Sequence, residues 1–127
     1  MKKFLVVFIV FSLFHSTQAS AQDSTLTNLL LIDENTFLGK PLDSVINHLP
    51  PGYIRIKIFS GGHQYTARKL KILYPNRVWI DLHVREFNHM NPIDTNRIWS
   101  IPLMRQEKLF KTAIYKGTVC YRGCDVF

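Results

Sequence analysis

Residues 69–84 read KLKILYPNRVWIDLHV, and this segment predicts a β-hairpin. Apolar and polar side chains alternate on both sides of a short polar break, which is typical of two antiparallel strands with one buried face. The inward residues must lie opposite one another, and a three-residue loop over 75–77 achieves this. The resulting register pairs Ile72 with Ile80, Leu70 with Leu82 and, on the outer face, Lys71 with Asp81.

The loop over 75–77 is expected to contain a residue in the left-handed conformation. We expect Asn76 or Arg77 to adopt it, and asparagine tolerates that conformation better. The same alternation occurs upstream in YIRIKIF, residues 53–59, so a third strand precedes the hairpin. If its isoleucines also face inward, Lys57 lies opposite or diagonal to a lysine of the next strand, which is mildly destabilising.

A helix is predicted before these strands, in FLGKPLDSVINHLPPG, residues 37–52. Pro41 suits the first helical turn, and Asp43 favours the positive end of the helix dipole. Over about 41–49 one apolar stripe is formed by Leu42, Val45, Ile46 and Leu49. Residues 37–45 are similar to the glycine-then-short-helix opening of small envelope assembly and inhibitor-type domains. That similarity is short and includes no functional residue, so it identifies no family.

The remaining segments complete an α+β pattern. We expect a first strand at Leu29–Ile32, a long loop over 85–99, a short helix over 102–108 capped by Ser100, and a last strand over 109–117. A disulfide-closed tail follows. The sequence therefore predicts one small α+β domain over 29–127, in which a helix packs on an antiparallel β-meander of three to five strands.

Residues 1–21 have the pattern of a secretory signal peptide. Two lysines precede the apolar run FLVVFIVFSLF, and Ala19-Ser20-Ala21 matches the small-x-small site of a signal peptidase. The run is shorter than the roughly 20 apolar residues of a spanning helix. We therefore expect export to the periplasm or extracellular space, with no membrane span after cleavage. Residues 22–28, QDSTLTN, are polar and predict a flexible lead-in.

The chain is basic, since its 16 Lys and Arg residues outnumber its 9 Asp and Glu residues. The excess persists after Lys2 and Lys3 leave with the signal segment. A basic domain favours an anionic partner, such as an anionic envelope component (polysaccharide or lipid headgroups) or an acidic protein. Export and the lack of a nucleic-acid-binding motif argue against nucleic acid. The alternative is an ordinary exported domain whose charges are solvated.

The two cysteines of the chain, Cys120 and Cys124, lie close together near its end. In an oxidising compartment such a pair predicts a disulfide. The loop it closes is short, so the chain-entropy stabilisation is about 2 kcal/mol. We expect the bond to secure the tail rather than the whole fold.

The outer face of the meander is the candidate binding surface. Strand alternation places on it Arg55, Lys57, Lys69, Lys71, Trp79 and His83. Basic residues interleaved with an aromatic residue are typical of surfaces that bind polyanions. The competing interpretation is a solvated sheet face, on which Lys and Arg are ordinary. Tyr121 and Arg122, inside the cysteine loop, form a smaller candidate for recognition.

A catalytic role has weaker support. No serine lies in a G-x-S-x-G elbow, and disulfide formation removes both thiols as nucleophiles. The sequence thus favours a non-catalytic binding or structural domain with no catalytic residues, metal or cofactor. The alternative is a small secreted hydrolase or metal-dependent enzyme using His83, Glu86 or His89. Histidine and carboxylate ligands suit zinc, but this spacing matches no known ligand motif.

Overall fold

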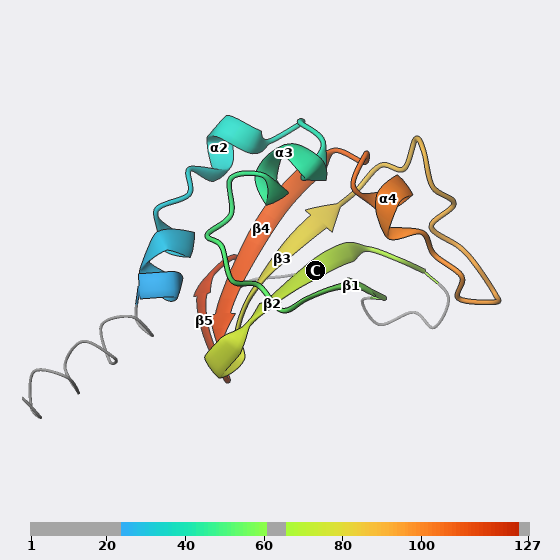
Figure 1. Ribbon diagram of the computed structural model, residues 1–127. Coiled ribbons are helices and arrows are strands. Elements are labelled where there is room, and N and C mark those ends of the chain that lie inside the picture. The colour runs from blue at the N-terminus through green and yellow to red at the C-terminus, as the bar shows by residue number, and fades with distance from the viewer. Residues whose placement is uncertain (1–23, 61–65, 125–127) are drawn as a thin grey trace, which may run out of the picture.

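The structure, a computed structural model, describes residues 24–60 and 66–124. The predicted signal segment, residues 1–21, lies outside the described residues. The chain forms one α+β domain around a five-stranded antiparallel sheet, in which each strand neighbours the next in sequence (Figure 1). The strands are β1 (Arg55–Phe59), β2 (Lys69–Tyr74), β3 (Val78–Val84), β4 (Leu109–Lys116) and β5 (Val119–Arg122). The helical segments are residues 24–30, α2 (Glu34–Phe37), α3 (Leu42–Ile46) and α4 (Ile101–Met104).

The first three strands have the predicted register. Ile72 lies opposite Ile80, and Lys71 lies opposite Asp81. β1 also keeps its isoleucines opposite those of β2, so Lys57 lies directly opposite Lys71. The period-two alternation therefore assigned the inward and outward side chains of these strands correctly.

The turn between β2 and β3 is the predicted three-residue loop. It forms the 3-10 turn η1 (Pro75–Arg77), in which Asn76 and Arg77 have φ values of 64° and 60°. Both candidate residues thus adopt the left-handed conformation. The Gly117 N–H donates to the carbonyl oxygen of Arg77 at 2.8 Å, which ties this turn to the end of β4.

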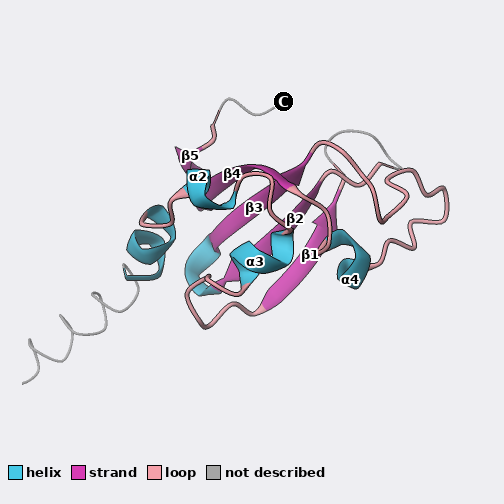
Figure 2. Ribbon diagram, turned by 90° about the horizontal axis from the view of Figure 1, so that it is seen from above, coloured by secondary structure: helices cyan, strands magenta, loops and turns pink. Residues whose placement is uncertain are grey.

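The helices α2, α3 and α4 lie on one side of the sheet (Figure 2). The apolar stripe of α3 is buried there as predicted, although the helix ends at Ile46 and continues only as a turn. Its N-cap residue, Pro41, has no side-chain acceptor. The N–H groups of Leu42 and Asp43 therefore donate to the carbonyl oxygens of Glu107 and Arg105, each at 2.9 Å.

Three segments differ from the prediction. Leu29–Ile32 is not a strand: residues 24–30 are helical, including the described part of the predicted lead-in, and a turn follows. An apolar run this short fits either type of element, and burial of Leu29 against the core decides it. The helix predicted over 102–108 is confined to α4, where Ser100 holds the N-cap position without a side-chain hydrogen bond. The tail contains a strand, β5, that periodicity did not indicate.

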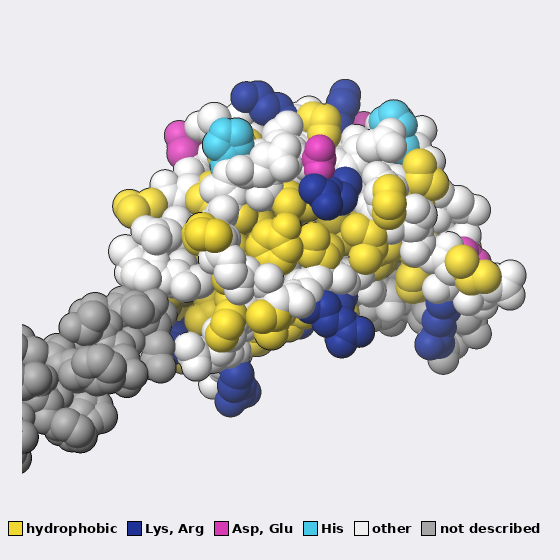
Figure 3. Space-filling view, viewed as in Figure 1, with side chains coloured by type: hydrophobic (Ala, Val, Ile, Leu, Met, Phe, Trp, Pro, Cys, Tyr) yellow, Lys and Arg dark blue, Asp and Glu magenta, His cyan; other side chains and the backbone are white. Residues whose placement is uncertain are grey.

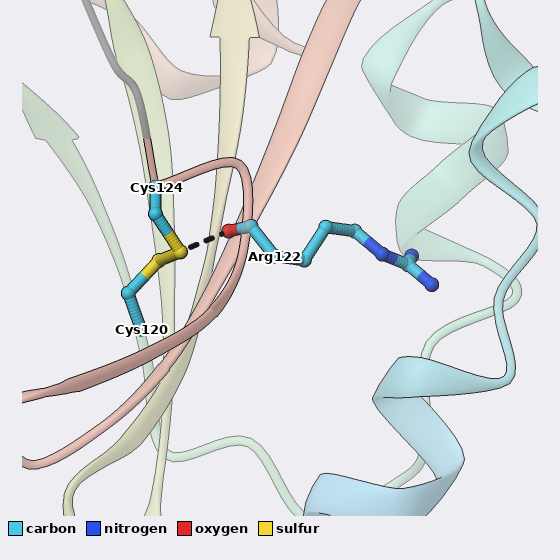
Figure 4. The surroundings of a disulfide bond; sticks show 3 residues. All are labelled: Cys120, Arg122 and Cys124. Atoms are coloured by element: carbon cyan, nitrogen blue, oxygen red, sulfur yellow. Dashed lines mark hydrogen bonds between the residues drawn. A yellow bond between two sulfur atoms is a disulfide. The ribbon is translucent and has the colours of Figure 1, made fainter.

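The predicted disulfide between Cys120 and Cys124 is formed, with Cα atoms 5.7 Å apart. Arg122, inside the loop, extends away from the bond (Figure 4). Its guanidinium donates to the carbonyl oxygens of Leu30 and Ile32 at 2.7 and 2.8 Å. These carbonyls lie at the end of the first helical segment, where orphan acceptors need donors. Arg122 therefore fastens that segment to β5 instead of forming an outward recognition tip.

The hydrophobic core lies between the sheet and the helical layer. Its completely buried side chains include Leu29, Leu42, Leu70, Ile72, Ile80, Leu82, Met104 and Ile114. On the side seen in Figure 3, apolar side chains gather in the middle and Lys and Arg side chains lie around them. Among the described residues, no helix has the length and apolar character needed to cross a membrane.

Candidate functional site

The face of the sheet opposite the helices carries the residues predicted for the outer binding surface of the meander. Outward positions of β1, β2 and β3 hold Arg55, Lys57, Lys69, Lys71, Trp79 and His83. β4 extends this surface, because Lys111 lies opposite His83 and Tyr115 lies opposite Trp79. We refer to these residues, together with Phe59 of β1, as the basic face.

Lysine and aromatic side chains interleave at the centre of the basic face. The Lys71 Nζ lies 4.5 Å from the ring centroid of Trp79 and 5.2 Å from that of Phe59. The Lys69 Nζ lies 4.7 Å from the Phe59 centroid, and Trp79 stacks on Tyr115 with centroids 5.2 Å apart. Cation–π contacts contribute about 0.5–1 kcal/mol each at exposed sites. They hold the ammonium groups against an apolar aromatic surface.

Asp81 lies within this cluster and is almost completely buried, with 1% of its surface exposed. Its carboxylate accepts a hydrogen bond at 2.9 Å from Lys69, its diagonal neighbour. Lys71, directly opposite and predicted to pair with it, instead extends toward the aromatic rings. Burial raises the pKa of Asp81, and the Lys69 hydrogen bond opposes that rise. The outer face of the sheet thus contains a buried ion pair, which the alternation of its side chains did not indicate.

His83 is neutral at pH 7. Burial, followed by the charges of Lys69 and Lys111, lowers the pKa of His83 to about 4, and Glu34 acts in the opposite direction. Its Nε2 atom is buried without a hydrogen-bond partner among residues 24–60 and 66–124. The ring therefore offers an unused donor or acceptor, depending on its tautomer.

The outward side chains of β3 form a row of such atoms. Trp79 Nε1, Asp81 Oδ1 and His83 Nε2 are buried at alternate positions, and none has a hydrogen-bond partner in the described part of the chain. A buried polar atom without a partner costs about 1–3 kcal/mol. Most buried polar atoms in proteins are satisfied, so a group that reached this row and paired with these atoms would offset that cost.

Acid should destabilise the protein through His83. The unfolded chain binds a proton near the ordinary histidine pKa of 6.5, whereas the folded protein resists protonation until about pH 4. This contribution to stability is fully present above pH 6.5 and is lost as the pH falls toward 4. Between these pH values the free energy of unfolding falls by at most about 1.4 kcal/mol per pH unit, which is the value for the binding of one proton. Urea unfolding midpoints measured between pH 7 and pH 4.5 check this prediction.

The control for this prediction is His83→Gln, because glutamine does not titrate. Its midpoint should change less with pH than that of the unsubstituted protein. Asp81 has a raised pKa and contributes the opposite slope at pH values above 3.8, so the difference between the two proteins isolates His83. An identical pH dependence in both proteins would contradict the burial of a neutral histidine.

The residues of the metal-enzyme alternative are not brought together. His83 lies on the basic face, whereas His89 lines a separate cleft with Asp43 and Ser44. Glu86 is exposed and lines neither that cleft nor the cavity beside His83. Within the described residues, no group of three His, Cys, Asp or Glu side chains is placed to hold a metal ion. The geometry therefore adds no support to this alternative.

The predicted loop over 85–99 is held by a residue that the sequence did not indicate. Glu107 is completely buried, and its carboxylate accepts hydrogen bonds from the N–H groups of Asn88 at 2.7 Å and His89 at 2.6 Å. A second anchor joins the loop to the segment before β2, where the Ala67 N–H donates to the Pro92 carbonyl at 2.8 Å. These anchors give a long aperiodic loop a defined position.

Comparison with protein families, with curated proteins and with solved structures gives no significant match.

Proposed function

We propose that the protein is an exported, non-catalytic binding domain that contacts an anionic component of the cell envelope through the basic face. The observation that carries the proposal is the placement of Lys69 and Lys71 against the rings of Phe59 and Trp79, with Lys57 on the neighbouring strand. Two of these lysines, Lys57 and Lys71, lie directly opposite one another, which is unfavourable without a partner. An anionic partner removes that repulsion.

The charge on β1 is available for such a partner. Arg55 and Lys57 are exposed, and neither forms an ion pair with another described residue. Asp81 is already paired with Lys69, so it leaves most of the positive charge of the face without compensation. Basic residues close to an anionic membrane surface contribute about 1 kcal/mol each. The aromatic rings add apolar contact that salt does not remove.

Export is part of the same proposal. Its support is the signal-like pattern of residues 1–21, together with a disulfide of the kind that persists in oxidising compartments. An envelope component is then the anionic partner that the protein meets first. A nucleic-acid partner has no support from any motif in the chain.

Binding to vesicles that contain anionic lipid tests the proposal. We expect binding at about 20 mM salt, and affinity at least about tenfold lower at 500 mM, because the screening length shortens severalfold. Neutral vesicles should not bind. Fluorescence of Trp79 reports contact with the face once Trp99→Phe has removed the signal of the second tryptophan. An anionic polysaccharide in place of vesicles distinguishes the two envelope sources.

The matched variants are Arg55→Glu/Lys57→Glu on the basic face and Lys40→Glu/Lys108→Glu near the start of α3. Both change the net charge equally. The first should weaken vesicle binding at least about tenfold, and the second much less. Lys71 is left unchanged because its contacts with aromatic rings belong to the fold. Absence of binding at low salt, or an equal loss in both variants, would refute the proposed contact.

A further inference from the structure

We infer that a cavity at the end of β3 binds a small amphiphilic anion, meaning a ligand with a hydrocarbon body and a carboxylate or phosphate head. The cavity has a volume of about 770 Å³. Small-molecule sites commonly have volumes of about 300–1,000 Å³. It lies beside the basic face and shares His83 and Lys111 with it, but not Arg55 or Lys57. The inference therefore goes beyond the envelope contact and can be tested separately.

The cavity is built into the fold. Ala67 and Val84 are buried lining residues next to the hydrophobic core. The loop over 85–99 supplies the opposite wall, including Phe87 and Ile93. That wall is fixed by the buried carboxylate described above and by a backbone bridge from Ile93 to Thr66. The space thus has a defined shape without a ligand.

The charged groups of the lining are all basic. Among the described residues, Arg68, Arg85 and Lys111 line the cavity, and neither aspartate nor glutamate does. None of the three forms an ion pair with a described residue. The Arg85 guanidinium lies over the Phe110 ring, 5.4 Å from its centroid, which holds it beside the apolar wall. Charge complementarity therefore selects an anionic head.

His83 adds a hydrogen-bonding side chain to the lining that contains these three cations. Its Nε2 atom is buried and has no hydrogen-bond partner among the described residues. In the tautomer that carries a proton on Nε2, the ring has a free donor that a carboxylate or phosphate oxygen would satisfy. A ligand that supplies this missing partner relieves a cost of about 1–3 kcal/mol.

The remaining lining residues are largely apolar and favour a ligand with a hydrocarbon body. Ile93 and Phe110 are 60% and 48% exposed, which is high for large apolar side chains next to a concave site. Covering them stabilises a complex by about 25 cal/mol per Å² of apolar surface removed from water. An uncharged hydrocarbon leaves three cations without a partner, and a bare inorganic anion leaves the apolar wall uncovered. An amphiphilic anion satisfies both features.

Titration calorimetry with dodecanoate, dodecyl phosphate and dodecanol, each below its micelle concentration, tests the inference. We expect saturable one-site binding of both anions, and dodecanol should bind at least about tenfold more weakly because it lacks the charge-assisted contacts. Whichever anion binds more tightly identifies a carboxylate or a phosphate as the natural head. Amide chemical shifts should change at Thr66–Arg68 and at Phe110 and Lys111.

Two variants and one control complete the test. Arg85→Gln/Lys111→Gln should weaken dodecanoate binding at least about tenfold with only a small change in the thermal unfolding midpoint, since neither side chain has an ion-pair partner in the described residues and Arg85 loses a single exposed cation–π contact. Ile93→Asp, which adds negative charge to the exposed wall, should weaken the binding of both dodecanoate and dodecyl phosphate. Arg55→Gln/Lys57→Gln removes equal charge from the basic face and should leave dodecanoate binding unchanged. Absent binding, equal binding of dodecanol, or unaltered affinity in both cavity variants would overturn the inference.

Discussion

Asp81→Ala should lower the free energy of unfolding by about 3 kcal/mol, because it leaves the Lys69 ammonium without its carboxylate in a largely dehydrated site. Asp81 is 1% exposed and the side chain of Lys69 is 15% exposed. An ammonium that is buried without a counter-charge is costly. The substitution also removes the negative charge that lies among Lys57, Lys69 and Lys71, so their mutual repulsion increases. Equilibrium unfolding in urea measures the change.

The control for Asp81→Ala is Glu86→Ala. Glu86 is exposed and has no hydrogen bond or ion pair with a described residue, so its loss should change stability by no more than about 0.5 kcal/mol. Asp81→Asn keeps the volume of the side chain and an acceptor for Lys69. Its loss of unfolding free energy should lie between those of Asp81→Ala and Glu86→Ala. A double-mutant cycle with Lys69→Met should show favourable coupling. If Asp81→Ala costs no more than Glu86→Ala, the ion pair does not hold the face together.

The register of the sheet could be predicted from the sequence because it depends on the local alternation of apolar and polar side chains. In β2 and β3 the inward positions are apolar or aromatic, and the outward positions are polar or aromatic except for Leu73, so a shift of one residue would turn Lys71, Asp81 and Trp79 toward the core. Asn76 further restricts the conformation of the turn, because asparagine tolerates the left-handed region that this loop requires. The outward residues of β4 follow the same rule, since Lys111 and Tyr115 alternate with buried Thr112 and Ile114. They could be assigned to the basic face once β4 was placed beside β3.

Features that depend on contacts between residues far apart in the sequence could not be predicted. The run at Leu29–Ile32 is too short for periodicity to separate helix from strand, and packing of Leu29 in the core determines the outcome. Asp81 occupies an outward position, and its burial arises because neighbouring lysine stems and aromatic rings cover it. Arg122 looked like an exposed tip because its acceptors, near residue 30, are about 90 positions away in the chain.

The cavity was hidden for the same physical reason. Its lining comes from the ends of β2, β3 and β4 and from an aperiodic loop, so no spacing in the sequence brings Arg68, Arg85 and Lys111 together. The loop has a fixed path only because one carboxylate, Glu107, accepts two backbone N–H groups 18 and 19 residues away. That contact links the stability of the fold to the shape of the cavity.

Glu107→Ala is therefore expected to lower the free energy of unfolding by about 4 kcal/mol. The N–H groups of Asn88 and His89 lose their acceptor, and hydrogen bonds to a charged group contribute about 1.5–3 kcal/mol each. Removal of a completely buried side chain also leaves a void beside the loop. Urea unfolding gives the magnitude. Hydrogen exchange should show a selective loss of protection at Asn88 and His89, even under conditions where the sheet remains folded.

Gln106→Ala is the matched control, because Gln106 is the exposed neighbour of Glu107 and its loss should change stability by no more than about 0.5 kcal/mol. Glu107→Gln retains one acceptor oxygen but turns an amide N–H₂ toward a backbone donor, so about half of the effect should remain. Glu107→Ala should also weaken dodecanoate binding although Glu107 does not line the cavity. Its role there is to position the wall that contains Phe87 and Ile93. Unchanged protection at Asn88 and His89 in Glu107→Ala would show that the loop is held by other contacts.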